Sequence, residues 1–461
     1  MKNRKTIRND LFKIFLTNGV RQPQAYYVTI KNHSFTYNDV NSILGDICVS
    51  VLNRPKKIKC VAINSLQSGD VFFFFWAGVA LGLDIVLAPG LSADDIKSTA
   101  MQSKLKIDLF LSDDKLLDLI DTISSYPVNN VGVDKIYHKR IRCNSSIYFF
   151  SSGTTGKPKF IRTTYYQFIR AMKCILNSKL MEYTHSQSVF IAVPLSHSYG
   201  LSAMVEYTQG GSHIFIPGQS NELGPVQSLL EKSISQTITA IEGVPYFYKQ
   251  ILILLDRISL PRLKHIGMGG DLVSDQVLGD FDKRIPGLSI SVRYGVTEIP
   301  SFVAVHFFRF TRDVPWRYLG RILPIYTCRL HSNAEENGEE LVVECAFLPS
   351  KKILVYTNDI VSGYAGTLTF IRRKMVMKVR GYRVNPVEIE SHLNEHPDIR
   401  ESKVYMLDEI LMADLVLELN KELEPALIRE YLAKRMTVTS IPNRIQFVER
   451  IIRTRTGKII R

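Results

Sequence analysis

The stretch Ser151-Ser152-Gly153-Thr154-Thr155-Gly156-Lys157-Pro158-Lys159 contains the residue types that bind phosphate. Its glycines allow the backbone to approach a ligand, its hydroxyls and amides can donate to phosphate oxygens, and its lysines add positive charge. A Walker A loop has four residues between its glycines and Lys-Ser/Thr after them, whereas only two threonines intervene here and a proline follows the first lysine. We therefore expect a nucleotide-binding loop of a different kind, with a flexible surface turn as the alternative.

A second candidate is the run Tyr294-Gly295-Val296-Thr297-Glu298, which follows a strand-like segment ending at Arg293. The glycine permits a tight turn, and the hydroxyl of Thr297 can reach a phosphate. The carboxylate of Glu298, placed beside ATP, could hold Mg²⁺. A purely structural turn is the alternative interpretation.

Two cationic stretches lie near the C-terminal end of the sequence. Residues 372–383 contain six Lys or Arg side chains and no acid, and a tail from Arg453 ends in Thr456-Gly457-Lys458. Like charges without acids favour an anionic partner or screening by water. A disordered basic tail is the ordinary interpretation of the second stretch.

Strand-like and helix-like segments alternate through most of the chain, which indicates parallel β-α-β units. Strands are expected near residues 57–64, 85–88, 108–111, 146–150, 189–194, 213–217, 239–244, 265–268 and 289–293. The composition changes near residue 371. We expect a large multi-layer α/β body over residues 1–371 and a small α+β domain over residues 372–461.

The motifs and their order resemble the adenylate-forming superfamily, which includes acyl-CoA synthetases, coumarate-CoA-ligase-like enzymes, peptide-synthetase adenylation domains and luciferases. The phosphate loop matches closely, and Tyr294-Gly295-Val296-Thr297-Glu298 matches the family's Tyr-Gly-x-Thr-Glu motif at every fixed position. Tyr356-Thr357-Asn358-Asp359 resembles Tyr-x-Thr-Gly-Asp, with Asn358 in place of glycine. Ile371 replaces a family glycine before Arg372, and Ile452 replaces a common proline. The resemblance implies a mobile C-terminal lid.

The resemblance also implies roles for individual residues. Asp359 would bind the ribose, Lys374 would be the hinge, and Lys458 would stabilise the α-phosphate during adenylation. Arg380 and Gly381 would lie beside the pantetheine arm of the incoming thiol. The full set expected to bind ATP or CoA comprises Ser151, Ser152, Gly153, Thr154, Thr155, Lys159, Gly270, Tyr294, Gly295, Thr297, Asp359, Arg372, Lys374, Lys378, Arg380, Gly381 and Arg383. The residues expected to act in catalysis are His197, Thr297, Glu298 and Lys458.

The segment Pro194-Leu195-Ser196-His197-Ser198-Tyr199-Gly200-Leu201 resembles the family's Pro-x-x-His-x-x-Gly-Leu, whose histidine gates the carboxylate end of the acyl pocket. No Gly-x-Ser-x-Gly elbow accompanies it, which disfavours a hydrolase. The absence of an Asp at this segment disfavours an α-amino acid as substrate. By analogy the pocket is lined by His197, Tyr199, Met204, Val244, Met268 and Val296. Gly267, Gly269 and Gly270 would leave room for a flat ring, so an aryl acid is favoured over an arylpropenoic or medium-chain acid.

The implied reaction converts a carboxylic acid and ATP, with Mg²⁺, into an acyl-adenylate and pyrophosphate, followed by thioester formation with CoA. Transfer to the phosphopantetheine of an acyl carrier protein is the alternative. A luciferase-like oxygenase is also possible within the family. The net charge of +14 would also fit a nucleic-acid-binding protein, which would bind DNA in a salt-dependent manner and release no pyrophosphate.

Composition agrees with a globular protein, because 45% of the 461 residues are hydrophobic. The longest apolar run, Val71 to Leu83, is shorter than the roughly 20 residues of a bilayer span and predicts a buried helix. The six cysteines lie far apart and predict free thiols rather than a zinc site. No signal segment is recognisable, so a cytoplasmic location without a membrane span is expected. One sequence does not give the oligomeric state.

Overall fold

The computed structural model describes residues 10–65, 68–112, 132–137, 145–152, 158–218, 224–308, 317–333, 338–348, 351–364, 367–373, 377–379, 382–407, 410–436, 440–453 and 459. Contacts divide the chain into two units. One consists of Met1–Thr327 and Glu344–Val355, and the other of Cys328–Val343 and Tyr356–Arg461.

The first unit contains a nine-stranded sheet with a parallel centre. Its strand order is β14-β13-β12-β11-β10-β8-β9-β1-β2. The strands β12, β11, β10, β8, β9 and β1 run parallel, whereas β2, β13 and β14 are antiparallel additions at the two edges. The bounds are β1 Tyr26–Ile30, β2 His33–Thr36, β8 Ser188–Ile191, β9 His213–Ile216, β10 Ala240–Gly243, β11 His265–Gly269, β12 Ser289–Tyr294, β13 Ala304–Phe308 and β14 Arg321–Ile322.

A five-stranded sheet in the same unit has the order β5-β3-β4-β6-β7. Its first four strands are parallel, and β7 is antiparallel to β6. The bounds are β3 Cys60–Asn64, β4 Asp84–Leu87, β5 Leu109–Ser112, β6 Ser146–Ser152 and β7 Pro158–Thr164. The expected β-α-β alternation is therefore present, while the antiparallel edge strands β7, β13 and β14 were not expected.

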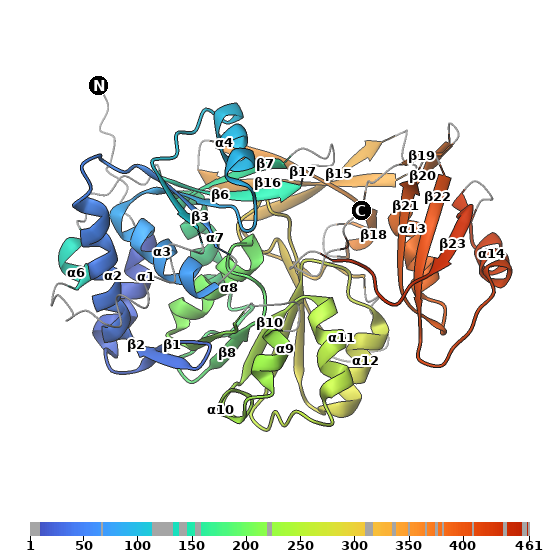
Figure 1. Cartoon of the computed structure of the whole chain (residues 1–461), viewed down its shortest axis with the longest axis horizontal. Helices are drawn as coiled ribbons and strands as arrows, with labels where there is room; N and C mark the ends of the chain where they lie inside the picture. The colour runs from blue at the N-terminus through green and yellow to red at the C-terminus, as the bar shows by residue number, and fades with distance from the viewer. Residues whose placement is uncertain are drawn as a thin grey trace. The chain divides into compact units, whose positions relative to one another are not determined.

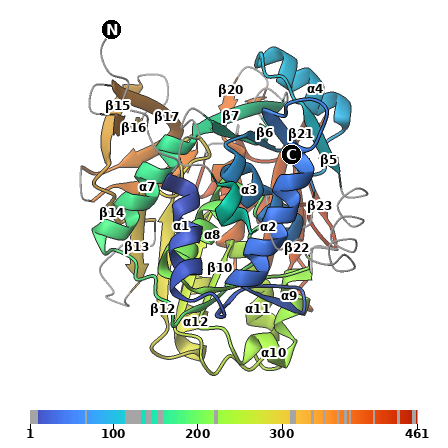
Figure 2. The same ribbon diagram turned by 90° about the vertical axis from the view of Figure 1, so that its left-hand side faces the viewer.

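The helices of this unit are α1 Asp10–Arg21, α2 Tyr37–Leu52, α3 Ser68–Leu81, α4 Ala93–Gln102, α6 Val133–Ile136, α7 Tyr165–Ser178, α8 Ser198–Gly210, α9 Gly224–Leu229, α10 Lys232–Ser235, α11 Pro245–Leu254 and α12 Asp275–Arg284. Helix α1 packs against α2, α3 and α8 (Figure 2). Helix α11 packs against α9 and α12 beside β10 (Figure 1). Apolar side chains from α9, α10, α11 and α12 and from β8, β9, β10, β11 and β12 form one apolar core of the unit.

Local sequence explains where several helices begin. The hydroxyl of Thr164 accepts from the backbone N–H of Gln167, and the Gln167 side chain accepts from the backbone N–H of Thr164. This capping box starts α7 at Tyr165. Helix α3 is buried along residues 68–80, which confirms the expected buried helix. No helix in the part of the chain that the structure describes is long and apolar enough to cross a bilayer.

A four-stranded sheet of order β15-β16-β17-β18 contributes residues to both units. Its strands are β15 Tyr326–Asn333, β16 Gly338–Leu348, β17 Lys351–Ser362 and β18 Thr369–Arg373. Residues 356–373 are grouped with the C-terminal residues, so the second unit begins earlier in the chain than the expected start at residue 372.

The rest of the second unit is the expected small α+β domain. It contains the hairpin β19 Met377–Val379 and β20 Tyr382–Val384, and a three-stranded sheet of β21 Ile399–Leu407, β22 Ile410–Leu417 and β23 Arg444–Phe447. Helices α13 Pro386–Asn394 and α14 Pro425–Ala433 complete it. Both helices contribute to its own apolar core, together with β21 and β22.

Candidate functional site

The expected phosphate loop begins at the end of β6 and ends at the start of β7, and these two strands pair antiparallel. Ser151 lies opposite Lys159 in the ladder, and Ser152 lies opposite Pro158. Lys159 is exposed. Gly153, Thr154 and Thr155 lie outside the described residues. The two antiparallel strands therefore bring the first hydroxyl residues and the second lysine of the motif to the same end of the five-stranded sheet.

The expected nucleotide residues at the end of the large sheet come from two neighbouring parallel strands. Gly269 pairs with Arg293, so Gly270 and Tyr294 follow at the same carboxyl edge of β11 and β12. Ligands of open α/β sheets bind at this edge. Gly270 has φ +84, a value that favours glycine.

The turn after β12 is closely packed. A Cβ at Gly295 would lie 2.9 Å from the carbonyl oxygen of Ser301, which explains why a glycine is needed there. Thr297 is half-buried and Glu298 is exposed. An exposed carboxylate beside a hydroxyl suits Mg²⁺, which is usually held by one or two carboxylates and substrate phosphates.

The expected substrate residues divide into two groups. His197 precedes the first turn of α8 and Val244 that of α11, and both are half-buried, as is Tyr199. Val296 is 8% exposed. Met204 and Met268, in contrast, have no exposed surface and belong to the apolar interior. Their expected contact with an acyl group remains a prediction.

In the second unit, Asp359 on β17 is buried and lies opposite Arg373 on β18. Its carboxylate oxygen is 3.6 Å from Nε of Arg373, a residue that the sequence interpretation did not single out. Asn358 has φ +60, and its backbone N–H donates to Glu340. Because asparagine adopts this conformation more readily than most residues, it can replace the family glycine here.

The remaining lid residues are only partly described. Lys378 on β19 pairs with Arg383 on β20, and Arg372 lies on β18. Lys374, Arg380, Gly381 and Lys458 lie outside the described residues, so their roles remain predictions.

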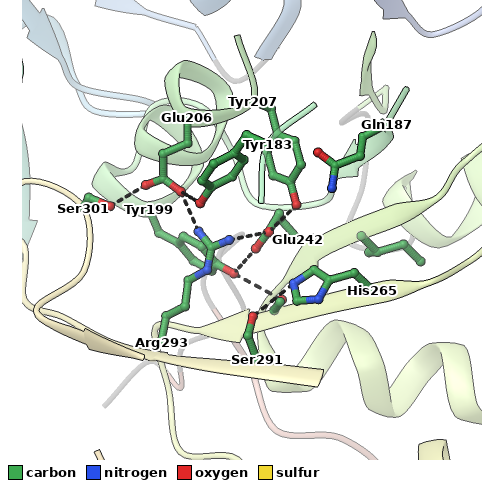
Figure 3. A network of polar contacts seen from close by, with 12 residues as sticks. Tyr183, Gln187, Tyr199, Glu206, Tyr207, Glu242, His265, Ser291, Arg293 and Ser301 are labelled. Carbon is green, nitrogen blue, oxygen red and sulfur yellow. Dashed lines mark hydrogen bonds and ion pairs between the residues drawn. The ribbon is translucent and has the colours of Figure 1, made fainter. Parts of the chain in front are cut away.

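A buried ionic network in the first unit was not expected from the sequence (Figure 3). Arg293 on β12 donates to Glu206 on α8 at 2.9 Å and to Glu242 on β10 at 2.6 Å. The arginine side chain is 3% exposed, and the two glutamate side chains are fully buried. Each glutamate is a single acid within an apolar segment, which is the sequence signal that could have revealed it.

Hydroxyl groups complete the network. Tyr183 donates to Glu206 at 2.6 Å, Tyr207 donates to Glu242 at 2.9 Å, and Tyr199 donates to Glu242 at 2.8 Å. Ser301, which follows the Tyr294–Glu298 turn, donates to the other oxygen of Glu206. The network therefore connects α8, β10, β12 and the segment after β12.

The network contains two carboxyl groups and one guanidinium, so its formal charge is −1 when both acids are ionised. Burial raises the pKa of Glu242, and the opposing effect of Arg293 is smaller. Burial also raises the pKa of Tyr199 and Tyr207 well above the ordinary value, with Glu242 as the next cause. The tyrosines therefore remain protonated and act as donors.

Comparison with known proteins agrees with the motifs. Residues 70–343 match the family described as AMP-binding enzyme, and residues 388–458 match the AMP-binding enzyme C-terminal domain.

No group of three or more His, Cys, Asp or Glu side chains able to hold a metal occurs among the described residues.

Individual relatives are distant. Luciferin 4-monooxygenase of Photuris pensylvanica is 23% identical over 410 residues, covering 78% of this chain and 72% of the relative. Acyl-CoA ligase easD of Emericella nidulans is 23% identical over 465 residues, covering 90% and 78%. Alignments with the first four curated relatives span between 60% and 78% of those relatives' lengths.

Among solved structures, the anthranilate CoA ligase AuaEII in complex with anthranoyl-AMP shares the fold. Its TM-score is 0.76 at 19% identity, with 97% of this chain and 95% of that chain covered. The family match covers more than half of the chain and includes both kinds of domain. The chain therefore belongs to the AMP-binding enzyme family and is an adenylate-forming, AMP-forming ligase of the acyl-CoA synthetase type.

Proposed function

We propose that this enzyme uses ATP to convert a carboxylic acid into an acyl-adenylate and then transfers the acyl group to the thiol of CoA. The observation that carries the proposal is the convergence of Gly270 and the Tyr294–Glu298 turn at the carboxyl edge of two adjacent parallel strands. A family match over both domain types supports it.

In the first half-reaction, a carboxylate oxygen attacks the α-phosphorus of ATP, and the bond to the pyrophosphate oxygen breaks. The hydroxyls and amides of the β6–β7 hairpin would bind the leaving phosphates, and Asp359 would bind the ribose. Lys458 would stabilise the negative charge that develops on the phosphoryl oxygens, an interaction stronger in the transition state than in the ground state. Glu298 would hold Mg²⁺, which neutralises phosphate charge when bound.

In the second half-reaction, the thiol sulfur attacks the acyl carbon and AMP leaves. The cationic residues 372–383 suit the phosphates of CoA. They also suit an acidic carrier protein, the alternative acceptor. Rotation of the C-terminal domain about Lys374 would exchange Lys458 for Gly381 between the two steps.

The test is a pyrophosphate-release assay with ATP, Mg²⁺ and a panel of carboxylic acids, followed by CoA or a phosphopantetheine-bearing carrier protein. We expect acid-dependent formation of AMP and pyrophosphate, then acyl-CoA. If none of the acids in the panel causes pyrophosphate release, the proposal is contradicted. If the acyl group is transferred to the carrier protein but not to CoA, the carrier protein is the acceptor.

A further inference from the structure

We propose that Tyr199, held in place by Glu242 and Arg293, closes the inner end of the acyl site and restricts the enzyme to short aliphatic monocarboxylic acids. This inference rests on the proposed function, because it assumes that the acid is bound near His197 and the carboxyl end of β11.

Two of the three glycines expected to leave room for a flat acyl group lie against other atoms of the protein. A methyl group at Gly267 would overlap the carboxylate of Glu242. A Cβ at Gly269 would lie 3.2 Å from the carbonyl oxygen of Arg293 and 3.3 Å from Cε1 of Tyr199. Beside Gly270, in contrast, the nearest atom is Cγ1 of Val244 at 3.6 Å. Of the three glycines, only Gly270 therefore retains space next to it.

Tyr199 is positioned between the expected carboxylate end of the site and the buried network. It lies two residues after His197 in the first turn of α8 and is half-buried, whereas Glu242 behind it is fully buried. An acyl group extending inward from His197 would therefore meet the tyrosine ring before any charged group.

The tyrosine ring is held from two sides (Figure 3). Its hydroxyl donates to Glu242 at 2.8 Å and is also 3.1 Å from the carbonyl oxygen of Gly267. The guanidinium of Arg293 lies 5.7 Å from the ring centroid. Glu242 is itself fixed by Arg293 and Tyr207. Moving the ring aside would remove a donor from a buried carboxylate and place that carboxylate against the acyl chain, which is unfavourable.

The charge of the network disfavours a second carboxylate on the substrate. Both terminal nitrogens of Arg293 already donate to glutamates, and the network has two carboxyl groups for one guanidinium. A substrate with a distal carboxylate would bring a third acid to this region without a new cation. The inference therefore expects a short, uncharged acyl group, whereas the sequence favoured an aryl, arylpropenoic or medium-chain acid.

The test compares acetate, butyrate, hexanoate, decanoate, phenylpropenoate and succinate in the pyrophosphate assay. For the unmodified enzyme, we expect kcat/KM for butyrate to exceed that for decanoate, phenylpropenoate and succinate by about 10-fold or more. A preference for decanoate, phenylpropenoate or succinate would overturn the inference. Pyrophosphate release with none of these acids nor with the wider panel would instead refute the proposed function.

Two variants locate the cause of the selectivity. Tyr199→Ala removes the ring but leaves the ion pairs of Arg293, so kcat/KM for hexanoate and decanoate should rise relative to butyrate by about 10-fold. Tyr199→Phe retains the ring but loses both hydroxyl hydrogen bonds that hold it, so its length profile should lie between those of the unmodified enzyme and Tyr199→Ala. If Tyr199→Ala is folded by circular dichroism but has an unchanged profile, the inference is wrong. If Tyr199→Ala does not fold, Tyr199→Leu, which also removes the ring, takes its place, and an unchanged length profile in that folded variant would overturn the inference.

Discussion

The side chain of a residue on the neighbouring strand explains why position 267 is a glycine. It lies on β11, and the carboxylate of Glu242 from β10 occupies the place where a side chain would begin. The sequence suggested that this glycine leaves room for a substrate. The structure shows that it leaves room for a buried glutamate.

We therefore predict that Gly267→Ala lowers the free energy of unfolding by about 2 kcal/mol or more, because the methyl group must displace a hydrogen-bonded carboxylate. Urea denaturation measures this. Gly279→Ala in α12 is the matched control, since a Cβ there meets no atom within 4 Å. The control should gain about 0.5–1 kcal/mol from its higher helix propensity. Equal stability of both variants would contradict the placement of Glu242.

Lys458 allows the two half-reactions to be separated. Lys458→Ala should lower ATP–pyrophosphate exchange by about 100-fold or more, because a cation is lost from the transition state of adenylation. The same variant should still transfer the acyl group from preformed acyl-adenylate to CoA. Equal loss of both activities would argue against a lid that presents different residues in the two steps.

The adjacent strands β11 and β12 hold a histidine in its neutral form. His265 lies opposite Ser289, with its Nδ1 3.3 Å from that hydroxyl and its Nε2 3.1 Å from Ser291. Burial, and then the charge of Arg293, lowers the pKa of His265 to about 3. The ring between the two strands is therefore the neutral imidazole, with one nitrogen as donor and the other as acceptor.

Because the pKa of His265 is lower in the folded chain than its ordinary value of 6.5, the unfolded chain binds this proton more readily. The stabilisation is present above pH 6.5 and is lost as the pH falls toward 3. Protonation of His265 can lower the free energy of unfolding by at most about 1.4 kcal/mol per pH unit. Because part of the residue is exposed, we expect a smaller decrease. Urea midpoints between pH 7 and 5 should fall less steeply for His265→Gln than for the unmodified protein. The exposed His185→Gln should retain the original slope, and an unchanged slope in His265→Gln would disprove the assignment.

For the whole molecule, the pairing of β17 with β18 predicts where the chain can be shortened. The ladder between β17 and β18 pairs Asp359 with Arg373 and Ser362 with Thr369. A chain ending at Arg373 keeps this ladder, whereas a chain ending at Ser362 exposes the edge of β17. We expect the shorter chain to melt at a lower temperature and to aggregate more. Equal melting and equal solubility of the two truncated proteins would show that β18 does not contribute to the sheet.

Much of the fold followed from local sequence. The run of apolar segments and intervening helices predicted the parallel strands β3, β4, β8, β9, β10, β11 and β12, and the composition change near residue 371 predicted a small α+β domain. The antiparallel strands β7, β13 and β14 were missed, because their pairing depends on which sheet edge is available. Motif order predicted the family, and the match over residues 70–343 confirmed it.

The sequence by itself determined the family, because its motifs are contiguous stretches that can be recognised without knowing what surrounds them. Only the tertiary structure decided what lies behind the expected acyl site. Glu206, Glu242 and Arg293 are separated by 36 and 51 residues (242 − 206 and 293 − 242), and each occurs alone in an apolar segment. Whether such charges face water or one another depends on how α8, β10 and β12 pack, since burial of an ion is tolerated only when its partners are placed beside it.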